Sequence, residues 1–175
     1  RRLPVASNVA MATNRSGAPA GTKLIASNKR ARYDYTIEDE IECGIVLSGS
    51  EVKALREGHM QMADAYARIL RGQVWLDGVH IPPYQFAHGV GAHDPNRARK
   101  LLLNRREIDK LEHRVNTERL SLVPLTFYFR DGRVKVLVGV GKGRKQTDKR
   151  QAMSERDNLM EIKKAMGRQA KGFRQ

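Results

Sequence analysis

The sequence predicts a mainly β protein, built as a closed or nearly closed antiparallel barrel with two to three flanking helices and a basic C-terminal tail. Six or so short segments of strand-forming residues are separated by turn signals, whereas two short segments before the tail have a helical pattern. The clearest strand is residues 133–140, in which four alternating valines share one face. At 175 residues the chain is long enough for one ordinary domain with tails.

Three regions are expected along the chain. Residues 1–22 have no apolar periodicity and do not begin with Met, so we expect a disordered N-terminal extension or an expression remnant. The barrel is expected over residues 23–147 and the basic tail over residues 148–175. A single cysteine, Cys43, excludes an internal disulfide framework and is typical of a reducing, cytoplasmic protein.

The first elements of the barrel follow a basic segment, residues 23–32. Residues 33–37 and 41–47 are predicted strands, interrupted by three consecutive acidic residues. A short helix then follows, which Ser50 can cap and Gly58 can end.

A hairpin and a second helix come next. Residues 65–70 and 74–81 are predicted strands joined by a three-residue loop around Gly72, which accepts a positive φ. The helix begins after Asn104, and Glu107 three residues on completes the pattern of a capping box.

The last hairpin joins residues 120–129 to residues 133–140 across Asp131-Gly132, a strong two-residue turn signal. Pro124 marks an edge or a bulge in the first of these strands. Short strands, hairpins and few helices are closest to the small five-stranded Greek-key barrels that bind oligonucleotides. The predicted fold is therefore an oligonucleotide-binding-type barrel.

The formal net charge of +14 lies at the two ends of the chain. Residues 1–33 hold seven cations and no acid, residues 142–175 hold eleven cations and four acids, and residues 34–141 hold fifteen of each. This segregation indicates a polyanionic partner, either nucleic acid or an anionic membrane surface. No apolar run approaches the ~18 residues of a transmembrane span, and no secretory signal pattern is visible.

One basic motif directly precedes the first predicted strand. It contains Asn28, Lys29, Arg30 and Arg32. Arginine can pair with phosphate or stack on a base, and asparagine can hydrogen-bond to base edges. Because Tyr33 follows and offers a stacking surface, RNA contact is favoured over a solvated tail.

A second basic motif, with Arg97, Arg99 and Lys100, precedes the second helix. Its spacing fits a phosphate clamp and an ordinary polar loop equally well. Glu42 lies close in sequence to the first basic motif and could accept a hydrogen bond from guanine, orient Arg32 or form a surface salt bridge.

The sequence gives no basis for catalysis or for a cofactor. The glycines of residues 139–143 do not form a phosphate-binding loop, and we expect them to let the backbone leave the sheet and approach a partner. His88 and His93 with Asp94 lack the spacing of a metal site. No catalytic triad or carboxylate pair is visible, so neither an enzyme nor a metal is predicted.

The tail from residue 151 onward has apolar residues at helical spacing, with cations on the remaining positions. Gly167 and Gly172 each cost about 1 kcal/mol within a helix. A lone helix of this length is marginal in water, so we expect a tail that is largely disordered alone and helical when bound.

The motifs NKRAR, RKLLL and GKGRKQTDKR, in this order and at these spacings, resemble the SsrA-binding protein (small protein B) family of bacterial trans-translation. The resemblance covers roughly residues 25–171. It implies an oligonucleotide-binding-type barrel that binds the tRNA-like domain of tmRNA (SsrA RNA). Such a protein delivers that RNA, with elongation factor Tu and GTP, to stalled 70S ribosomes. Its tail enters the empty mRNA channel along small-subunit rRNA and folds there as a helix.

The resemblance assigns contact residues to two partners. The tmRNA side would comprise Asn28, Lys29, Arg30, Arg32, Glu42, Lys100, Leu102 and Lys135, to which the basic and aromatic motifs add Tyr33, Arg97 and Arg99. The ribosome side would comprise Lys142, Arg144, Lys145, Asp148, Lys149 and Arg150, continued along the tail by Lys163, Lys164, Met166 and Arg168.

The chain departs from the family at two positions: it has Tyr33 and Thr147 where many members have histidine. Tyrosine keeps the ability to stack, whereas threonine loses it. Two other functions are alternatives: a structural ribosomal protein with basic extensions, which fits the composition equally well, and an RNA-processing enzyme, for which we expect no activity.

Overall fold

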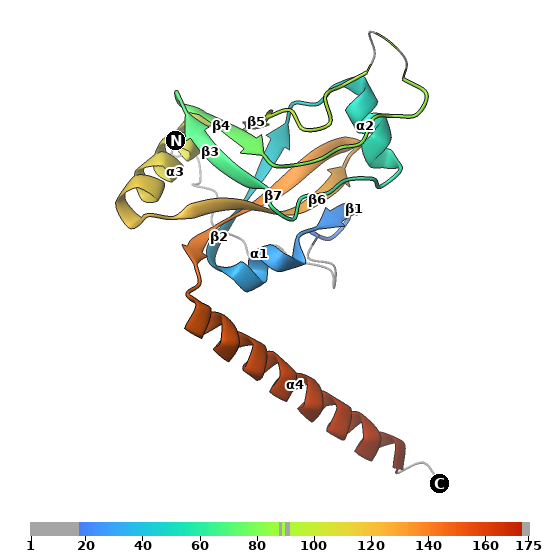
Figure 1. The fold of residues 1–175 in the computed structure, drawn as a ribbon, viewed down its shortest axis with the longest axis vertical. Coiled ribbons are helices and arrows are strands. Elements are labelled where there is room, and N and C mark those ends of the chain that lie inside the picture. The colour runs from blue at the N-terminus through green and yellow to red at the C-terminus, as the bar shows by residue number, and fades with distance from the viewer. Residues whose placement is uncertain (1–17, 88, 90–91, 173–175) are drawn as a thin grey trace, which may run out of the picture.

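A computed structural model describes residues 18–87, 89 and 92–172 of the chain (Figure 1). Most of the predicted disordered extension therefore lies outside the described residues. The described part contains both a sheet region and a long C-terminal helix that runs away from it.

Within the described residues, seven strands form one sheet in which the strands pair antiparallel. The strands are β1 (Lys23–Ser27), β2 (Tyr35–Ile45), β3 (Tyr66–Leu70), β4 (Gln73–Asp77), β5 (Arg99–Leu102), β6 (Ser121–Arg130) and β7 (Arg133–Gly143). Their order is β1-β6-β3-β4-β5-β2-β7, and β7 also pairs with β6. A mainly antiparallel β fold is thus confirmed.

Four helices accompany the sheet in the described part of the chain: α1 (Lys29–Asp34), α2 (Gly49–Arg56), α3 (Arg105–Glu118) and α4 (Gln146–Gly172). Figure 1 places α2 and α3 at opposite ends of the sheet. Leu55 of α2 and Leu111 of α3 are buried in the main core. These two helices therefore cover apolar side chains that the strands alone would leave exposed.

The main core lies against the valine face of β7, as the alternation predicts. The four valines of that face are 0–9% exposed and belong to the core cluster. Val136 pairs with Cys43 of β2 on one side and with Phe127 of β6 on the other, and both partners are buried. Full burial of such a side chain contributes about 1.5–3 kcal/mol.

The turns and the bulge of the hairpins are largely as predicted. The Asp-Gly turn joins β6 and β7 with positive φ at both residues. The register of β6 on β7 shifts between Pro124 and Thr126, which confirms the bulge. The loop around Gly72 holds two residues instead of three, because Gln73 already pairs with Leu70.

The N-terminal elements differ from the prediction. Residues 23–32 form β1 and most of α1, and β2 is one strand from Tyr35 to Ile45, although a break was expected at its acidic residues. A register shift between Ile37 and Asp39 absorbs these residues. The helix went unrecognised because it is one and a half turns long and buries one residue, Ala31, against the sheet.

Helices α2 and α3 both begin with a capping box. In α3 the Glu107 carboxylate accepts from the Asn104 backbone N–H at 3.0 Å, as predicted. In α2 the cap is Ser48 and not Ser50: the Glu51 carboxylate accepts from the Ser48 N–H at 2.8 Å. Glu51 is completely buried, which favours the cap that lets its carboxylate bond inward.

Gly139 and Gly141 near the end of β7 serve the sheet itself, which corrects for these two glycines the expectation that they approach a partner. A Cβ on Gly141 would lie 2.2 Å from the Thr36 carbonyl oxygen of β2, and one on Gly139 would lie 2.9 Å from a Leu125 methyl group. Both glycines are buried within the β7 strand. They permit close packing where β2 shifts register.

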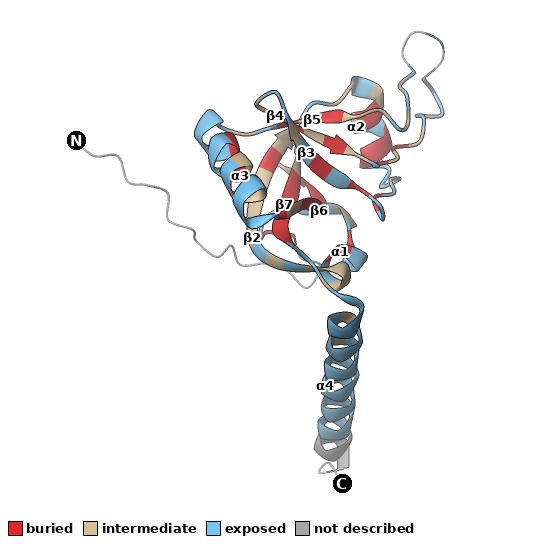
Figure 2. Cartoon of the chain, turned by 60° about the vertical axis from the view of Figure 1, so that its left-hand side comes forward, coloured by how far each residue is buried: buried red, intermediate tan, exposed pale blue. Residues whose placement is uncertain are grey.

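Helix α4 leads away from the sheet and is almost entirely exposed along the part whose side chains are described (Figure 2). It includes most of the segment for which helical spacing was expected. Its helical content without a partner stays a prediction. None of the helices in the described residues is both long and apolar enough to cross a membrane.

Candidate nucleic-acid interface

The side of the sheet opposite the main core carries polar residues on four neighbouring strands. Ile41 and Cys43 of β2 pack into the core, so alternation directs Glu40, Glu42 and Gly44 to the other side. We call this side the outer face and define it by Glu40, Glu42, Lys100, Leu102, Tyr128, Arg130 and Lys135.

Glu42 lies at the centre of the outer face and pairs with β6. Its carboxylate lies 2.7 Å from the Arg130 guanidinium and accepts the Tyr128 hydroxyl hydrogen bond. Burial of the ring and the adjacent Glu42 carboxylate raise the pKa of Tyr128. Of the roles left open for Glu42, orientation of Arg32 is wrong, because Arg32 pairs elsewhere. The carboxylate holds Arg130 at the surface.

The cations of α1 lie beside this face. The Arg32 guanidinium contacts Glu40, two residues before Glu42 on the same side of β2, at 2.8 Å. Lys29 and Arg30 are exposed, and Arg30 reaches Asp34 at 3.2 Å. Exposed pairs of this kind contribute about 0–1 kcal/mol, so phosphate can replace either carboxylate at little cost.

Strand β5 extends the outer face away from α1. Leu102 is 49% exposed and pairs with Gly44, which in turn pairs with Lys135 of β7. A Cβ on Gly44 would come within 3.2 Å of the Leu102 Cβ, so the absence of a side chain at Gly44 leaves room for Leu102 beside β2. Lys100 alternates with the buried Leu101 and is partly exposed. The structure therefore brings Leu102 and Lys135 to either side of one β2 residue.

The Asn28 side chain is not exposed for RNA contact, which corrects the prediction. Its side chain is buried: the amide oxygen accepts from the Ala31 N–H at 3.1 Å, and the amide nitrogen donates to the carbonyls of Met62 at 3.1 Å and Pro124 at 3.3 Å. These bonds use both ends of the amide. Asn28 caps α1 and fixes its start to the sheet.

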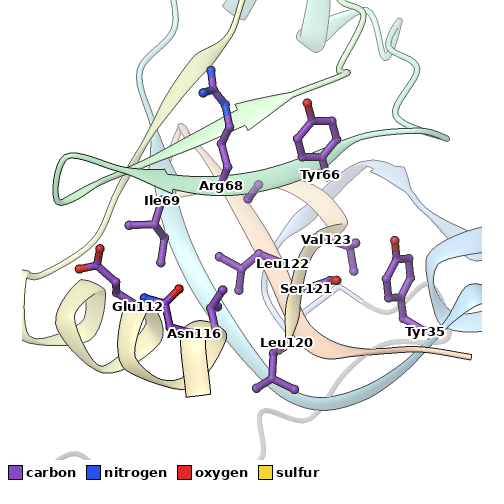
Figure 3. Close-up of a pocket in the computed structure, with 12 residues that line it drawn as sticks. Tyr35, Tyr66, Arg68, Ile69, Glu112, Asn116, Leu120, Ser121, Leu122 and Val123 are labelled. Atoms are coloured by element: carbon purple, nitrogen blue, oxygen red, sulfur yellow. The ribbon is translucent and has the colours of Figure 1, made fainter. Parts of the chain in front are cut away.

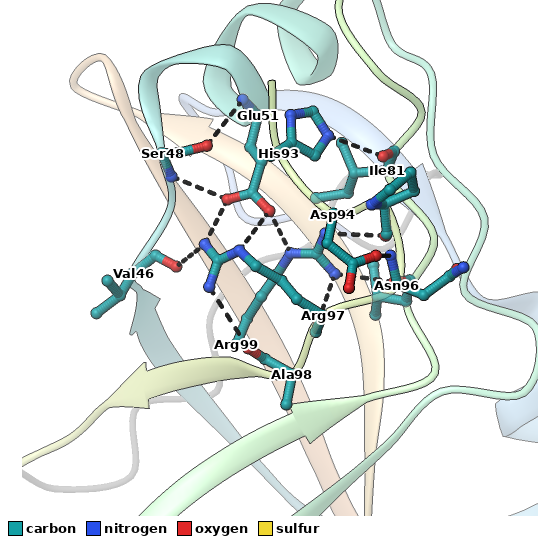
Figure 4. Close-up of polar contacts among 12 residues, drawn as sticks. Val46, Ser48, Glu51, Ile81, His93, Asp94, Asn96, Arg97, Ala98 and Arg99 are labelled. Carbon is teal, nitrogen blue, oxygen red and sulfur yellow. Dashed lines mark hydrogen bonds and ion pairs between the residues drawn. The ribbon is translucent and has the colours of Figure 1, made fainter. Parts of the chain in front are cut away.

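Arg99 is also buried and is therefore not part of the predicted interface. Figure 4 shows its polar contacts. Its guanidinium is completely buried and pairs with Glu51 at 2.9 Å. It also donates to the carbonyl oxygens of Val79 at 2.8 Å and Pro95 at 3.0 Å. Arg97 is partly buried and contacts the same carboxylate at 2.6 Å. The motif is a buried ion-pair cluster, and the phosphate clamp is wrong for Arg99.

The electrostatics of this cluster follow from burial and pairing. Burial alone would raise the pKa of Glu51, but hydrogen bonds from Arg97, Ser48 and Arg99 outweigh it, so its pKa is lowered. Burial lowers the pKa of Arg99, and the Glu51 charge opposes this. The described part of the chain has no buried side-chain nitrogen or oxygen without a partner. The cluster therefore joins α2 to the segment before β5 as a satisfied structural unit.

The predicted ribosome-side residues lie at the end of β7 and along α4. Most are exposed: Lys142, Lys145, Asp148, Arg150, Lys163, Lys164 and Met166. Arg144 donates to the Thr36 hydroxyl at 3.2 Å, and Lys149 pairs with Asp34 at 3.0 Å. The Arg168 side chain lies outside the described residues. Tyr33 is half-buried and donates from its hydroxyl to the Met153 sulfur at 3.3 Å.

The histidine loop has a structural role where it is described. The two ring nitrogens of His93 bond to the Ser50 hydroxyl and the Ile81 carbonyl, each at 2.9 Å. His88 lies outside the described residues. Among those described, no group of three or more potential metal ligands occurs.

A cleft of about 460 Å³ opens between α3, β3 and the start of β6 (Figure 3). Tyr35, Tyr66, Glu112 and Asn116 contribute to its lining, and Tyr66 is 50% exposed. Strand β3 pairs with β6 at a single position beside it. The predicted contact residues lie elsewhere, so the cleft and the outer face are separate features of the described surface.

Comparison with known proteins decides the family. A model of the SmpB protein family matches residues 25–168 of the chain. The chain belongs to the SmpB protein family. The SsrA-binding protein of Nocardioides sp. is 53% identical over 153 residues, which cover 87% of this chain and 96% of that protein. The SsrA-binding protein of Mycobacterium leprae is 48% identical over 164 residues, which cover 93% and 99% of the two chains.

A solved structure supports the same assignment. A chain of the structure described as "tmRNA-SmpB: a journey to the center of the bacterial ribosome" is 41% identical and superposes with a TM-score of 0.57. The match covers 69% of this chain and 85% of the other. The SmpB-family assignment therefore rests on sequence and on structure.

Sequence reasoning missed two residues of the outer face and one at the end of α1. The Asp-Gly turn places Tyr128 opposite Lys135, so alternation along the hairpin could have identified it. Arg130 precedes the turn, but its pairing with Glu42 joins strands far apart in sequence. Asp34 contacts α4 from more than one hundred residues away, and the sequence carries no local signal for this contact.

Proposed function

We propose that this SmpB-family chain is an RNA-binding protein that binds the tRNA-like domain of tmRNA and delivers it to stalled ribosomes in trans-translation. The family match over residues 25–168 carries the proposal, because this range includes the whole outer face and α1. SmpB is an RNA-binding family and not an enzyme family. Relatives are named for binding SsrA, and the related solved structure names tmRNA and the ribosome.

The fold supports this function in more detail. Strand pairings lead from β6 through β3, β4, β5 and β2 to β7 and back to β6. We take this ring as an oligonucleotide-binding-type barrel with β1 added at one edge of β6. In such a barrel the outward-facing residues are held by the inward-facing core. The outer face would thus present its side chains in fixed positions.

Phosphate contacts from α1 would supply most of the affinity for tmRNA. Lys29, Arg30 and Arg32 are exposed on one short helix, and their pairings with carboxylates are weak enough to exchange for phosphate. Lys135 and Lys100 would add further positive charge on the outer face. Leu102, half exposed among these cations, offers apolar contact to a splayed nucleotide.

Glu42 would orient the bound RNA on this surface and would not add to the affinity. Its carboxylate repels phosphate, while it holds Arg130 by an ion pair and Tyr128 by a hydrogen bond. The Arg130 guanidinium lies 5.8 Å from the centre of the Tyr128 ring. These contacts fix the position of the Arg130 guanidinium at the edge of the outer face.

The end of β7 and α4 would contact the ribosome. Lys142, Lys145 and Arg150 would address rRNA at the decoding centre, and α4 would enter the vacant mRNA channel. Thr147 has no ring that could stack on a base at the decoding centre. Elongation factor Tu with GTP would join through the tmRNA, in the cytoplasm. We expect circular dichroism of the isolated tail in buffer to show little helix, and full helicity would contradict folding upon binding.

A tail deletion tests the division between the two partners. Removal of residues 154–175 leaves the outer face and α1 intact, so tmRNA affinity should stay within about twofold while tagging of stalled products is lost. Affinity is measured by gel shift with the tRNA-like domain, and tagging in a reconstituted translation system. Loss of tmRNA affinity on deletion would contradict the two-site arrangement.

A further inference from the structure

Asp34 connects α1 with the start of α4. Its carboxylate accepts from the Lys149 ammonium group at 3.0 Å and from the Arg30 guanidinium at 3.2 Å. Its backbone carbonyl accepts from the Arg144 N–H at 2.8 Å. One residue at the end of α1 therefore contacts the segment that leads into α4 and the first turn of α4 itself.

Two neighbouring contacts reinforce this junction. The Tyr33 hydroxyl donates to the Met153 sulfur at 3.3 Å, and the Arg144 guanidinium donates to the Thr36 hydroxyl at 3.2 Å. Figures 1 and 2 both place α1 beside the first turns of α4. Beyond Met153, the described side chains of α4 are exposed. The direction of α4 is therefore set by contacts within its first eight residues.

Small changes at this junction would be amplified along the helix. Twenty-seven residues at 1.5 Å each make α4 about 40 Å long. A rotation of about 20° at its base would move its end by roughly 14 Å. A helix that must enter a narrow channel thus depends on a fixed base.

The Asp34–Lys149 pair is better placed to fix this base than an ordinary surface pair. The two side chains are 25% and 27% exposed, whereas Arg30 is 65% exposed. The hydrogen bond from Lys149 is the main reason that the pKa of Asp34 is lowered. If phosphate takes Arg30, the carboxylate keeps its pairing with Lys149 and the junction persists.

We propose that Asp34 is a positioning residue that orients α4 relative to the RNA-binding helix α1. A bound tmRNA and the tail would thereby keep a fixed relative orientation. This inference rests on the proposed function. It assigns Lys149 to the inside of the junction, where it orients the tail, and leaves contact with rRNA to its exposed neighbours Lys145 and Arg150.

Charge reversal with rescue tests the proposal in the full chain. Spin labels are placed at Gln73→Cys on β4 and Met160→Cys on α4, both exposed positions, while the buried native Cys43 stays unlabelled. Double electron–electron resonance then reports the distance distribution between the label on the sheet and the label on the tail. We expect the distribution to be clearly broader for Asp34→Lys than for the parent protein, because the junction holds the first turns of α4 even if the rest of the tail folds only on binding.

Lys149→Asp alone should broaden the distribution equally, and the double reversal should restore it. The control is Asp157→Lys, the same change at an exposed α4 position without an ion-pair partner among the described residues. Tagging at saturating tmRNA should fall at least tenfold in each single variant and recover in the double variant. Saturation removes any effect of the added charge on tmRNA affinity.

Two outcomes would overturn the proposal: unchanged distances in both single variants, or broadening that the double reversal does not repair. If Asp34→Lys fails to fold, Asp34→Asn removes the ion pair without adding charge and should still broaden the distribution. Failure of the proposed function is distinguishable. In that case the distances respond as expected, whereas tagging is indifferent to deletion of residues 154–175.

Discussion

Two basic motifs of nearly the same composition lie in opposite environments in this protein. Residues 29–32 (KRAR) form α1, which buries Ala31 and leaves its three cations on the surface. Residues 97–100 (RARK) lead into β5, where Arg99 is completely buried against Glu51. A charge count does not distinguish them, because the difference lies in the element that carries each motif and in the acid it meets.

The difference shows what makes a cation available to RNA. On a short helix over the sheet, one small residue faces inward and the cations point to solvent. On a strand, alternation sends every second residue inward, and Arg99 shares that side with Leu101. Burial of an arginine is tolerated because Glu51, on a separate helix, supplies the opposite charge. The two motifs should therefore respond differently to the same substitutions.

The largest expected effect is on stability. Glu51→Ala leaves the buried Arg99 guanidinium without its counter-charge, so the free energy of unfolding should fall by about 3–5 kcal/mol. The matched control is Glu57→Ala, at the exposed end of the same helix, which should cost under about 0.5 kcal/mol. Urea denaturation followed by circular dichroism measures both. A loss below 1 kcal/mol for Glu51→Ala would show that the cluster is not structural.

The next effect is on RNA affinity. Replacement of Lys29, Arg30 and Arg32 by alanine should weaken binding of the tRNA-like domain and reduce the slope of log K against log salt by about 2–3, at roughly 0.7–0.9 for each phosphate contact. Stability should change by less than 1 kcal/mol. Fluorescence anisotropy over a potassium chloride series gives the slope. An unchanged slope would place the RNA site elsewhere.

Acid should weaken the buried cluster in a defined direction. The pKa of Glu51 is lowered in the folded state, so the unfolded state binds more protons as the pH falls. Its contribution is complete above the unfolded value of about 4.3 and is lost as the pH drops through the folded value. We expect the urea concentration at the unfolding midpoint to decrease as the pH is lowered from 5 to 3, and to decrease less steeply in Glu51→Gln. Equal slopes in the two proteins would contradict this assignment.

The smallest effect concerns the reactivity of the Cys43 thiol, which tests how β2 side chains alternate between the core and the outer face. Cys43 is 2% exposed beside Glu42, and burial raises the pKa of its thiol to about 12. The folded protein should therefore not react with a thiol reagent at pH 8 within an hour, whereas the urea-unfolded protein should react fully within minutes. Rapid labelling of the folded protein would mean that β2 presents the opposite face to the core.

Local patterns in the sequence predicted much of the sheet. The valine alternation of β7, the Asp-Gly turn and the Asn104 cap depend on neighbouring residues, and all three are confirmed. The short helix α1 was missed because its register depends on Ala31 packing against β6, a contact across almost one hundred residues. A sequence pattern does not contain such a contact.

The site was predictable in kind but not in detail. Exposure of the α1 cations agrees with the basic motif, whereas Asn28 and Arg99 were misassigned because amide and guanidinium groups serve equally well inside a fold and on RNA. The distinction requires the carbonyl groups and the carboxylate that surround them. Likewise, the pairing of Asp34 with Lys149 follows from the place where β7 ends beside α1.

The most direct measurement is an amide and arginine side-chain NMR titration of the full chain with the tRNA-like domain of tmRNA. We expect perturbed signals for Lys29, Arg30 and Arg32 of α1 and for the outer face around Glu42 and Lys135, while the Arg99 side chain and α4 beyond Met153 stay unchanged. Perturbations centred on the cleft beside α3, or on α4, with α1 unaffected, would contradict it.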